Sequence, residues 1–206
     1  MRIMRKLTIL AVLSLTVLSA CGEKPEVRQA RAQTALKSGK PDDALKLIDK
    51  VLEAQPNNEV ALLVKAQAQM SLAQFAAAKA TLDKLLAINP NFDEARRVRI
   101  ELLRRVMDSL LQTSGFANDA AAQKRFDDEL GDALTQVKWR EEHKDAKAEG
   151  AYMRATFCVL EIRKLDVFKR DMDRSLADTP TLPDDKHQEA ADKARRIKAE
   201  REKAKC

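Results

Sequence analysis

The sequence predicts an all-α fold, an antiparallel helix-pair solenoid with additional C-terminal helices. One block of sequence recurs after 34 residues with the same apolar pattern. Elsewhere, apolar residues recur at the three- and four-residue spacing of amphipathic helices. The composition agrees with a helical protein, because 34% of the residues are charged and only five of the 206 are glycine.

Small residues and helix-ending prolines define the repeated block. Its two copies align without gaps, and the matched positions are Ala32, Ala44 and Pro56 in the first and Ala66, Ala78 and Pro90 in the second. The alanines let two antiparallel helices approach closely. Between the helices of the first copy, Gly39 can end one helix in the left-handed conformation and Pro41 can open the next. Each copy is therefore expected to form a helix hairpin.

Residues 25–92 resemble two tetratricopeptide repeats, a family whose helix–turn–helix unit is 34 residues long. The resemblance rests on these alanine and proline positions and on Phe75, an aromatic residue before a second helix. The family's early Trp is replaced by Arg28 and Leu62. The resemblance implies a stack of helix hairpins with a concave binding face.

Further helices are expected to cover the end of this stack, since two repeats cannot bury all of their apolar faces. A helix from Asp93 to about Gly115 has a stripe that can seal the second repeat: Ala95, Val98, Leu102, Val106 and Leu110. A helix capped by Asn118 follows, with a stripe of Phe126, Leu130, Ala133, Leu134 and Val137. The next helix, Tyr152 to Met172, is apolar at Phe157, Leu160, Ile162, Leu165 and Phe168. Degenerate repeats and a separate cap both fit this block.

These features divide the chain into five segments. We expect a signal segment in residues 1–20, a lipid anchor with a short tether in 21–24, two repeats with a sealing helix in 25–115, a second helical block in 116–176, and a proline-containing linker with a charged helical tail in 177–206. The tail has good helix formers but little apolar surface, so a solvated helix and a partly disordered tail both fit.

The N-terminal segment has the pattern of an export signal. Its basic start is formed by Arg2, Arg5 and Lys6. The apolar run that follows, residues 7–18, is shorter than the ~20 residues needed to span a bilayer. The run ends in the sequence Leu18, Ser19, Ala20 and Cys21.

This ending resembles the lipobox of bacterial lipoprotein signals. The resemblance implies cleavage before Cys21, a covalent diacylglycerol on its thiol and an N-acyl chain such as palmitate. Gly22 stands where an aspartate would retain the protein in the inner membrane, so we expect the outer membrane, with the protein facing the periplasm. The alternatives are an ordinary secretory signal with a chance cysteine and a buried first helix.

Charge argues against a nucleic-acid partner. Three of the 38 basic residues lie in the signal segment, so the remainder is nearly balanced by 32 acidic residues.

Two cysteines remain besides Cys21. Cys158 and Cys206 can pair in an oxidising compartment, or Cys158 can be a small buried residue and Cys206 a free terminal thiol. The sequence leaves both arrangements open.

No motif for catalysis or for binding a cofactor or metal is found. The five glycines are scattered, and neither a Gly-x-Ser-x-Gly nor a His-Glu-x-x-His sequence is present. His143 and His187 are isolated among charged residues, and residues 140–145 are expected to form a solvated helix face. We therefore expect a protein that is not an enzyme and needs no cofactor beyond the acyl groups.

The tetratricopeptide resemblance also implies a peptide-binding site, because the first helix of each repeat lines the concave face. The corresponding residues are Gln29, Gln33, Leu36, Val60, Leu63, Gln67 and Met70. Arg97 and Arg104, on the helix that follows, are expected to extend this site and to contact acidic groups of a ligand. Burial of the apolar members in the core, and pairing of the arginines with nearby carboxylates, are the alternatives.

The sequence therefore predicts a membrane-anchored adaptor for protein–protein interactions in the bacterial cell envelope. Assembly of a pilus, a secretion system or outer-membrane barrels would fit such an adaptor. The alternatives are a self-associating structural or stress-related lipoprotein without a dedicated peptide ligand, and an accessory that binds peptidoglycan or its processing enzymes. The sequence does not identify the partner or the oligomeric state.

Overall fold

The computed structural model describes residues 23–178 and the separate residues 192, 195 and 199. Between residues 23 and 178 the chain forms α-helices and one short 3-10 helix, without a β-strand. The all-α prediction is therefore confirmed. The expected signal segment, Cys21, Cys206 and most of the expected linker and tail lie outside the described residues.

The described chain divides into two compact units, residues 23–73 and the residues from 74 onward. The expected segment boundaries, with two repeats and a sealing helix in residues 25–115, stay a prediction. In the second unit, α5 (Phe75–Ile88) contacts α6 (Asp93–Gln112), and α6 contacts the helices that follow it. The second half of the second repeat therefore shares a compact unit with the C-terminal helices.

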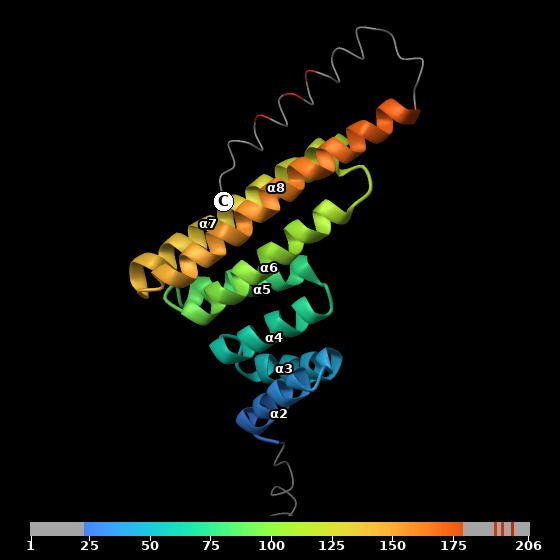
Figure 1. Cartoon of the computed structure of the whole chain (residues 1–206). Helices are drawn as coiled ribbons and strands as arrows, with labels where there is room; N and C mark the ends of the chain where they lie inside the picture. Colours follow the sequence, from blue (N-terminus) through green and yellow to red (C-terminus); the bar gives the residue numbers. More distant parts are fainter. Residues whose placement is uncertain (1–22, 179–191, 193–194, 196–198, 200–206) are drawn as a thin grey trace, which may run out of the picture. The chain divides into compact units, whose positions relative to one another are not determined.

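The first unit is made of α2 (Pro25–Lys37), α3 (Pro41–Ala54) and α4 (Glu59–Ser71), each in contact with the other two. Figure 1 shows the hairpin that α2 and α3 form. Its turn has the geometry predicted for Gly39, whose φ is +70°. The amide of Lys40 donates to the carbonyl oxygen of Ala35 at 2.9 Å, and that of Gly39 donates to Leu36 at 3.1 Å. This is the Schellman arrangement that ends a helix.

Small and branched aliphatic residues form the core of the first unit. The buried members are Ala32, Ile48, Val51, Ala61 and Val64, and the leucines packed against them are Leu36, Leu45, Leu47 and Leu52. Ala32 and Ala44 have no exposed surface, as the predicted close approach of the helices requires. The unit therefore buries its core without an aromatic side chain.

The second unit contains α5, α6, the short helix η1 (Phe116–Asn118), α7 (Ala120–His143) and α8 (Lys147–Asp178). Its α6 is buried on two sides. The expected stripe is buried at Ala95, Val98, Leu102 and Val106, and partly at Leu110. The sequence analysis did not anticipate the second buried side, formed by Ile100, Leu103, Met107 and Leu111.

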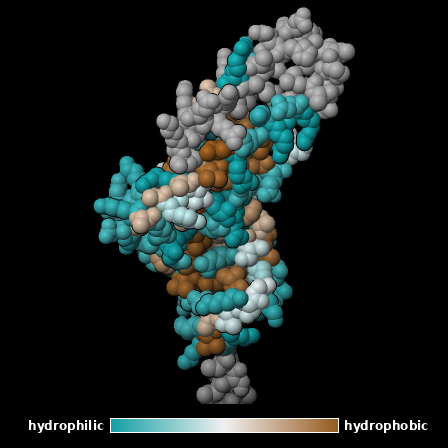
Figure 2. All heavy atoms as spheres, viewed as in Figure 1, coloured by the Kyte–Doolittle hydropathy of each residue, from teal (hydrophilic) through white to brown (hydrophobic). Residues whose placement is uncertain are grey.

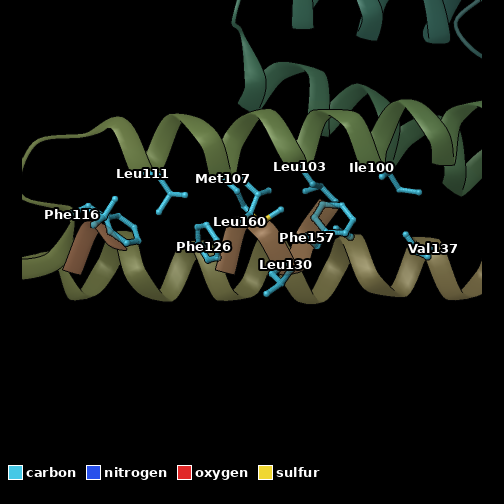
Figure 3. Close-up of a cluster of buried hydrophobic side chains, with 12 residues drawn as sticks. Ile100, Leu103, Met107, Leu111, Phe116, Phe126, Leu130, Val137, Phe157 and Leu160 are labelled. Carbon is cyan, nitrogen blue, oxygen red and sulfur yellow. The ribbon is translucent and has the colours of Figure 1, made fainter. Parts of the chain in front are cut away.

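Aromatic residues fill the space between α6, α7 and α8. Figure 3 shows the second buried side of α6 facing α7, with Phe126, Phe157 and Leu160 between the helices. The rings of Phe116 and Phe126 meet edge to face, with 6.1 Å between their centroids. These aromatic side chains therefore join α7, α8 and the short helix η1 in one core.

Two expectations for α7 were wrong in detail. The capping residue is Asp119, whose side chain accepts hydrogen bonds at 3.0 Å from the amides of Ala121 and Ala122. Asn118 instead ends the short helix η1. Leu134 is 38% exposed although we had placed it in the buried stripe. One residue turns an α-helix by about 100°, so Leu134 points away from the buried Ala133.

Cys158 lies on α8, partly buried, and it forms a disulfide. Cys21 and Cys206, the other cysteines of the sequence, both lie outside the described residues. The disulfide excludes the buried free thiol considered for Cys158, and pairing with Cys206 stays a prediction.

Candidate functional site

Seven of the nine predicted peptide-binding residues lie in the first unit. They belong to α2 and α4, the first helices of the two expected repeats, and these two helices contact each other. The seven residues are Gln29, Gln33 and Leu36 on α2, with Val60, Leu63, Gln67 and Met70 on α4. We call this set the α2–α4 face.

The apolar members of the α2–α4 face differ in exposure. Leu63 and Met70 are buried, at 9% and 6% exposed, and Leu36 packs against the core of the unit. Val60 is 38% exposed. Sequence spacing could not separate these residues, because each of them lies on the first helix of a repeat at a position that the resemblance assigns to the concave face. Val60 is therefore the apolar side chain of this face that is most open to a ligand.

The polar members of the face are three glutamines, Gln29, Gln33 and Gln67. All three are partly exposed, and their side chains form no hydrogen bond with the rest of the described chain. Gln69 on the same helix differs, since it is buried and has a partner. A side-chain amide offers both donors and an acceptor, which is the complement of a peptide backbone. The face therefore presents three solvent-accessible amides without a protein partner and one exposed valine.

The two arginines of the predicted site lie on α6, in the second unit, and both are already paired with carboxylates. Arg97 lies 3.3 Å from Glu94. Arg104 lies 2.8 Å from Glu101 and 2.6 Å from Asp108. The hydrogen bond to Glu101 is the main reason why the pKa of Arg104 is raised. A contact of these arginines with a ligand stays a prediction, and it would require the ligand to compete with these pairs.

A polar network in the second unit was missed by the sequence analysis. Arg140 is 5% exposed, although its neighbourhood was expected to be a solvated helix face. Its guanidinium lies 2.7 Å from Asp93 and 2.9 Å from Glu149. Burial disfavours the charge of Arg140, but the hydrogen bonds to Glu149 and Asp93 outweigh this effect and raise its pKa. No local signal reveals this burial, because the partners lie on other helices.

Figure 2 shows charged and polar atoms over much of the visible surface. Hydrophobic atoms reach the surface along part of α8, and Val159 of this helix is 51% exposed.

Within the described residues, no group of three or more histidine, cysteine or acidic side chains is placed to bind a metal ion. The ring of His143 stacks on Trp139 with 4.6 Å between centroids. In the same part of the chain, no helix is both long and apolar enough to cross a bilayer.

Comparison with known proteins identifies the repeat region. No curated protein and no solved structure matches the chain significantly. The family model of the tetratricopeptide repeat matches residues 35–100, which begin in α2 and end in α6. Proteins of this family generally act as non-catalytic modules for protein–protein interaction. The match and the observed helix pairs agree, and together they support tetratricopeptide repeats in this part of the chain.

Proposed function

We propose that this protein is a lipid-anchored adaptor of the bacterial cell envelope and that it binds a peptide segment of another envelope protein on the α2–α4 face. The observation that supports the proposal most directly is the set of amides without a partner in the described chain, Gln29, Gln33 and Gln67, on the same face as the exposed Val60. The tetratricopeptide match supports a protein as the ligand.

The chemistry of the face favours an internal segment of the partner over its C-terminus. Tetratricopeptide proteins that bind a terminal carboxylate do so with lysine and asparagine on the first helix. Gln29 and Gln33 occupy the corresponding positions here, and neither offers a positive charge. Their amides can pair with backbone groups, and Val60 can contact an apolar side chain of the ligand.

The anchor would hold this face close to the membrane. Acyl chains on Cys21 would bind the protein durably, since each buried methylene contributes about 0.8 kcal/mol. Only residues 22–24 separate Cys21 from the start of α2 at Pro25, and three residues span at most ~11 Å. The proposed location is the outer membrane, with the repeats in the periplasm.

In-cell crosslinking with a matched pair of variants tests the peptide-binding face. Val60→Glu places a charge on the face, whereas Val27→Glu places the same charge on an exposed valine of α2, 49% exposed, outside the set. Leu63 and Met70 are poor choices because their substitution would disturb the core. We expect Val60→Glu to lose the envelope proteins that the native chain captures and Val27→Glu to retain them. Equal capture by both variants, or crosslinks only between copies of the chain, would refute the proposal.

The anchor needs a separate test. Cys21→Ser removes the thiol that would accept the diacylglycerol. We expect the native protein in the membrane fraction, and its N-terminal peptide should be heavier by the mass of the acyl groups. The Cys21→Ser variant should appear in a different fraction or keep an uncleaved signal segment. A native N-terminal peptide without added acyl mass would refute the anchor and leave the peptide-binding face untouched.

A further inference from the structure

A hollow of about 520 Å³ lies within the first unit, between α2 and α3 near their turn. Its walls are formed by Arg31, Thr34, Ala35 and Ser38 from α2 and its end, and by Lys40, Asp43, Lys46 and Leu47 from the turn and α3. None of these residues belongs to the α2–α4 face. The hollow is therefore a second feature of the repeat region, and the proposed peptide site does not account for it.

Positive charge dominates the hollow. Three of its side chains are cationic, and Asp43 is its one acidic residue. Lys40 and Lys46 form no ion pair within the described chain. Arg31 already donates to Glu23 at 2.7 Å, and this hydrogen bond is the main reason why the pKa of Glu23 is lowered. A guanidinium has five N–H donors, so Arg31 can hold Glu23 and a second anion together.

The remaining groups fit a phosphate ester better than a bare anion. A phosphate presents several oxygens in different directions, which matches cations from three separate positions of the chain. Ser38 adds a hydroxyl, whose side chain forms no hydrogen bond in the described chain. Ala35 and Leu47 add an apolar wall that can contact the carbon atoms of an ester. The lining is largely exposed, which suits a group presented by a surface more than an enclosed small molecule.

We propose that this hollow binds the phosphate of an anionic phospholipid headgroup and so fixes the repeats against the membrane surface. A lipid is assigned as the carrier of the phosphate because the proposed acyl anchor would hold the protein at a membrane, so this assignment rests on the proposed function. Arg31 lies six residues into α2, about 9 Å along the helix, after a tether of at most ~11 Å. The acyl chains would thus hold the hollow at a high local concentration of headgroups.

Vesicle binding by the chain from Gly22 onward, without acyl groups, tests the hollow independently of the anchor. The vesicles contain phosphatidylglycerol in phosphatidylcholine, or phosphatidylcholine alone. The hollow variant is Lys40→Glu with Lys46→Glu. The matched control is Lys37→Glu with Lys50→Glu, which makes the same change of charge at exposed lysines of the same two helices outside the hollow. Far-UV circular dichroism verifies that each variant folds.

We expect binding to the phosphatidylglycerol vesicles alone, a loss of ten-fold or more in the hollow variant, and a loss below about three-fold in the control. Asp43→Asn should strengthen binding, because it removes the acidic group of the hollow. Equal losses in the two double variants would show attraction by overall charge and overturn the proposal. Absence of vesicle binding would also overturn the proposal. So would displacement of the vesicles by inorganic phosphate at the same phosphate concentration, because the hollow would then bind free phosphate as well as it binds a lipid headgroup. None of these outcomes bears on the crosslinking result at Val60.

Discussion

The two units of this protein bury their cores in different ways. In the first unit, alanines and branched aliphatic residues allow helices close in sequence to approach each other. In the second, the aromatic rings of Phe116, Phe126 and Phe157 fill the space between α6, α7 and α8. Ion pairs between helices also differ in burial. Arg99 of α6 pairs with Asp132 of α7, and both side chains are largely buried, whereas the first-unit pair of Lys65 with Asp49 is more exposed.

The difference shows why the repeat helices can be recognised from the sequence, whereas the packing of the helices that follow them cannot. A repeat has to present the same small residues at the same spacing, so its packing leaves a periodic record. An aromatic core has no such requirement, since a large side chain from any helix can fill the same space. The measurements below test this contrast from the largest expected effect to the smallest.

Removing an aromatic ring from the second core should have the largest effect. Phe157 is 1% exposed, and Phe157→Ala should lower the free energy of unfolding by about 3–5 kcal/mol through lost burial and a cavity. Trp139, the single tryptophan of the chain, lies in this unit, so its fluorescence in urea reports the change. Ile48→Val in the first core is the comparison, with about 1 kcal/mol expected. In each variant, the urea midpoint from fluorescence is compared with the midpoint from circular dichroism. If the two midpoints shift by the same amount within each variant, the two units unfold together and the contrast between them is refuted.

A charged pair between helices should have the next largest effect. Arg99 donates to Asp132 at 2.7 Å and 3.0 Å, and Asp132→Asn should lower the free energy of unfolding by about 2 kcal/mol at pH 7. The control is Asp128→Asn on the same helix, whose partner is Lys124. Because Asp128 is 64% exposed, we expect a change below about 0.5 kcal/mol.

The same pair predicts a pH dependence. Burial opposes ionisation of Asp132, but hydrogen bonds from Arg99 and Gln136 outweigh it and hold its pKa below the ordinary value of 3.8. A lowered folded-state pKa stabilises the protein above the unfolded value, and this contribution is lost as the pH falls through the folded-state pKa. The difference between native protein and Asp132→Asn should therefore stay constant down to about pH 4 and shrink at pH 3. An unchanged difference at pH 3 would contradict the assigned pair.

The smallest effects concern the turns of the two repeats, where the chain departs from its own pattern. Gly39 and Ala73 occupy equivalent positions 34 residues apart, and both have positive φ, +70° and +56°. Glycine adopts this conformation without strain, whereas alanine does not. Gly39→Ala should therefore destabilise by about 1 kcal/mol and Ala73→Gly should stabilise by about 0.5 kcal/mol. A Cβ at Gly39 would meet no atom within 4 Å, so the effect is purely conformational.

Ala30→Gly is the control for these turns, because Ala30 lies in the interior of α2 and is exposed. A glycine there should destabilise by about 1 kcal/mol. Urea unfolding followed by circular dichroism measures all three variants. If Ala73→Gly destabilises as Ala30→Gly does, left-handed strain at Ala73 is refuted.

Most of the fold could be predicted from local patterns. Pro25 and Pro41 fixed the starts of two helices, and the Gly39 turn was predicted together with its left-handed conformation. The end of α6 differs from the prediction of about Gly115, since the helix stops at Gln112 and Gly115 begins the turn that moves the next cap to Asp119. Such a shift depends on a short 3-10 helix, for which the sequence has no distinct signal.

The candidate site was predicted less completely. Its positions followed from the repeat, but the exposure of the side chains did not, since Val60 is exposed and Leu63, three residues later on the same helix, is buried. The three glutamines were expected on the face, whereas their lack of hydrogen-bond partners depends on every group around them. The hollow beside α3 was not anticipated, because its lining comes from two helices whose relative placement sets its shape.

The sequence alone determined the helix pairs, their period and the turn at Gly39 between the first two helices, because these depend on contacts within a few residues or on a spacing that repeats. Only the tertiary structure decided which apolar residues are accessible, which arginines are already paired and how Arg140 comes to be buried beside Asp93. These properties depend on groups distant in the sequence, and exposure and charge pairing are set by the sum of all such neighbours.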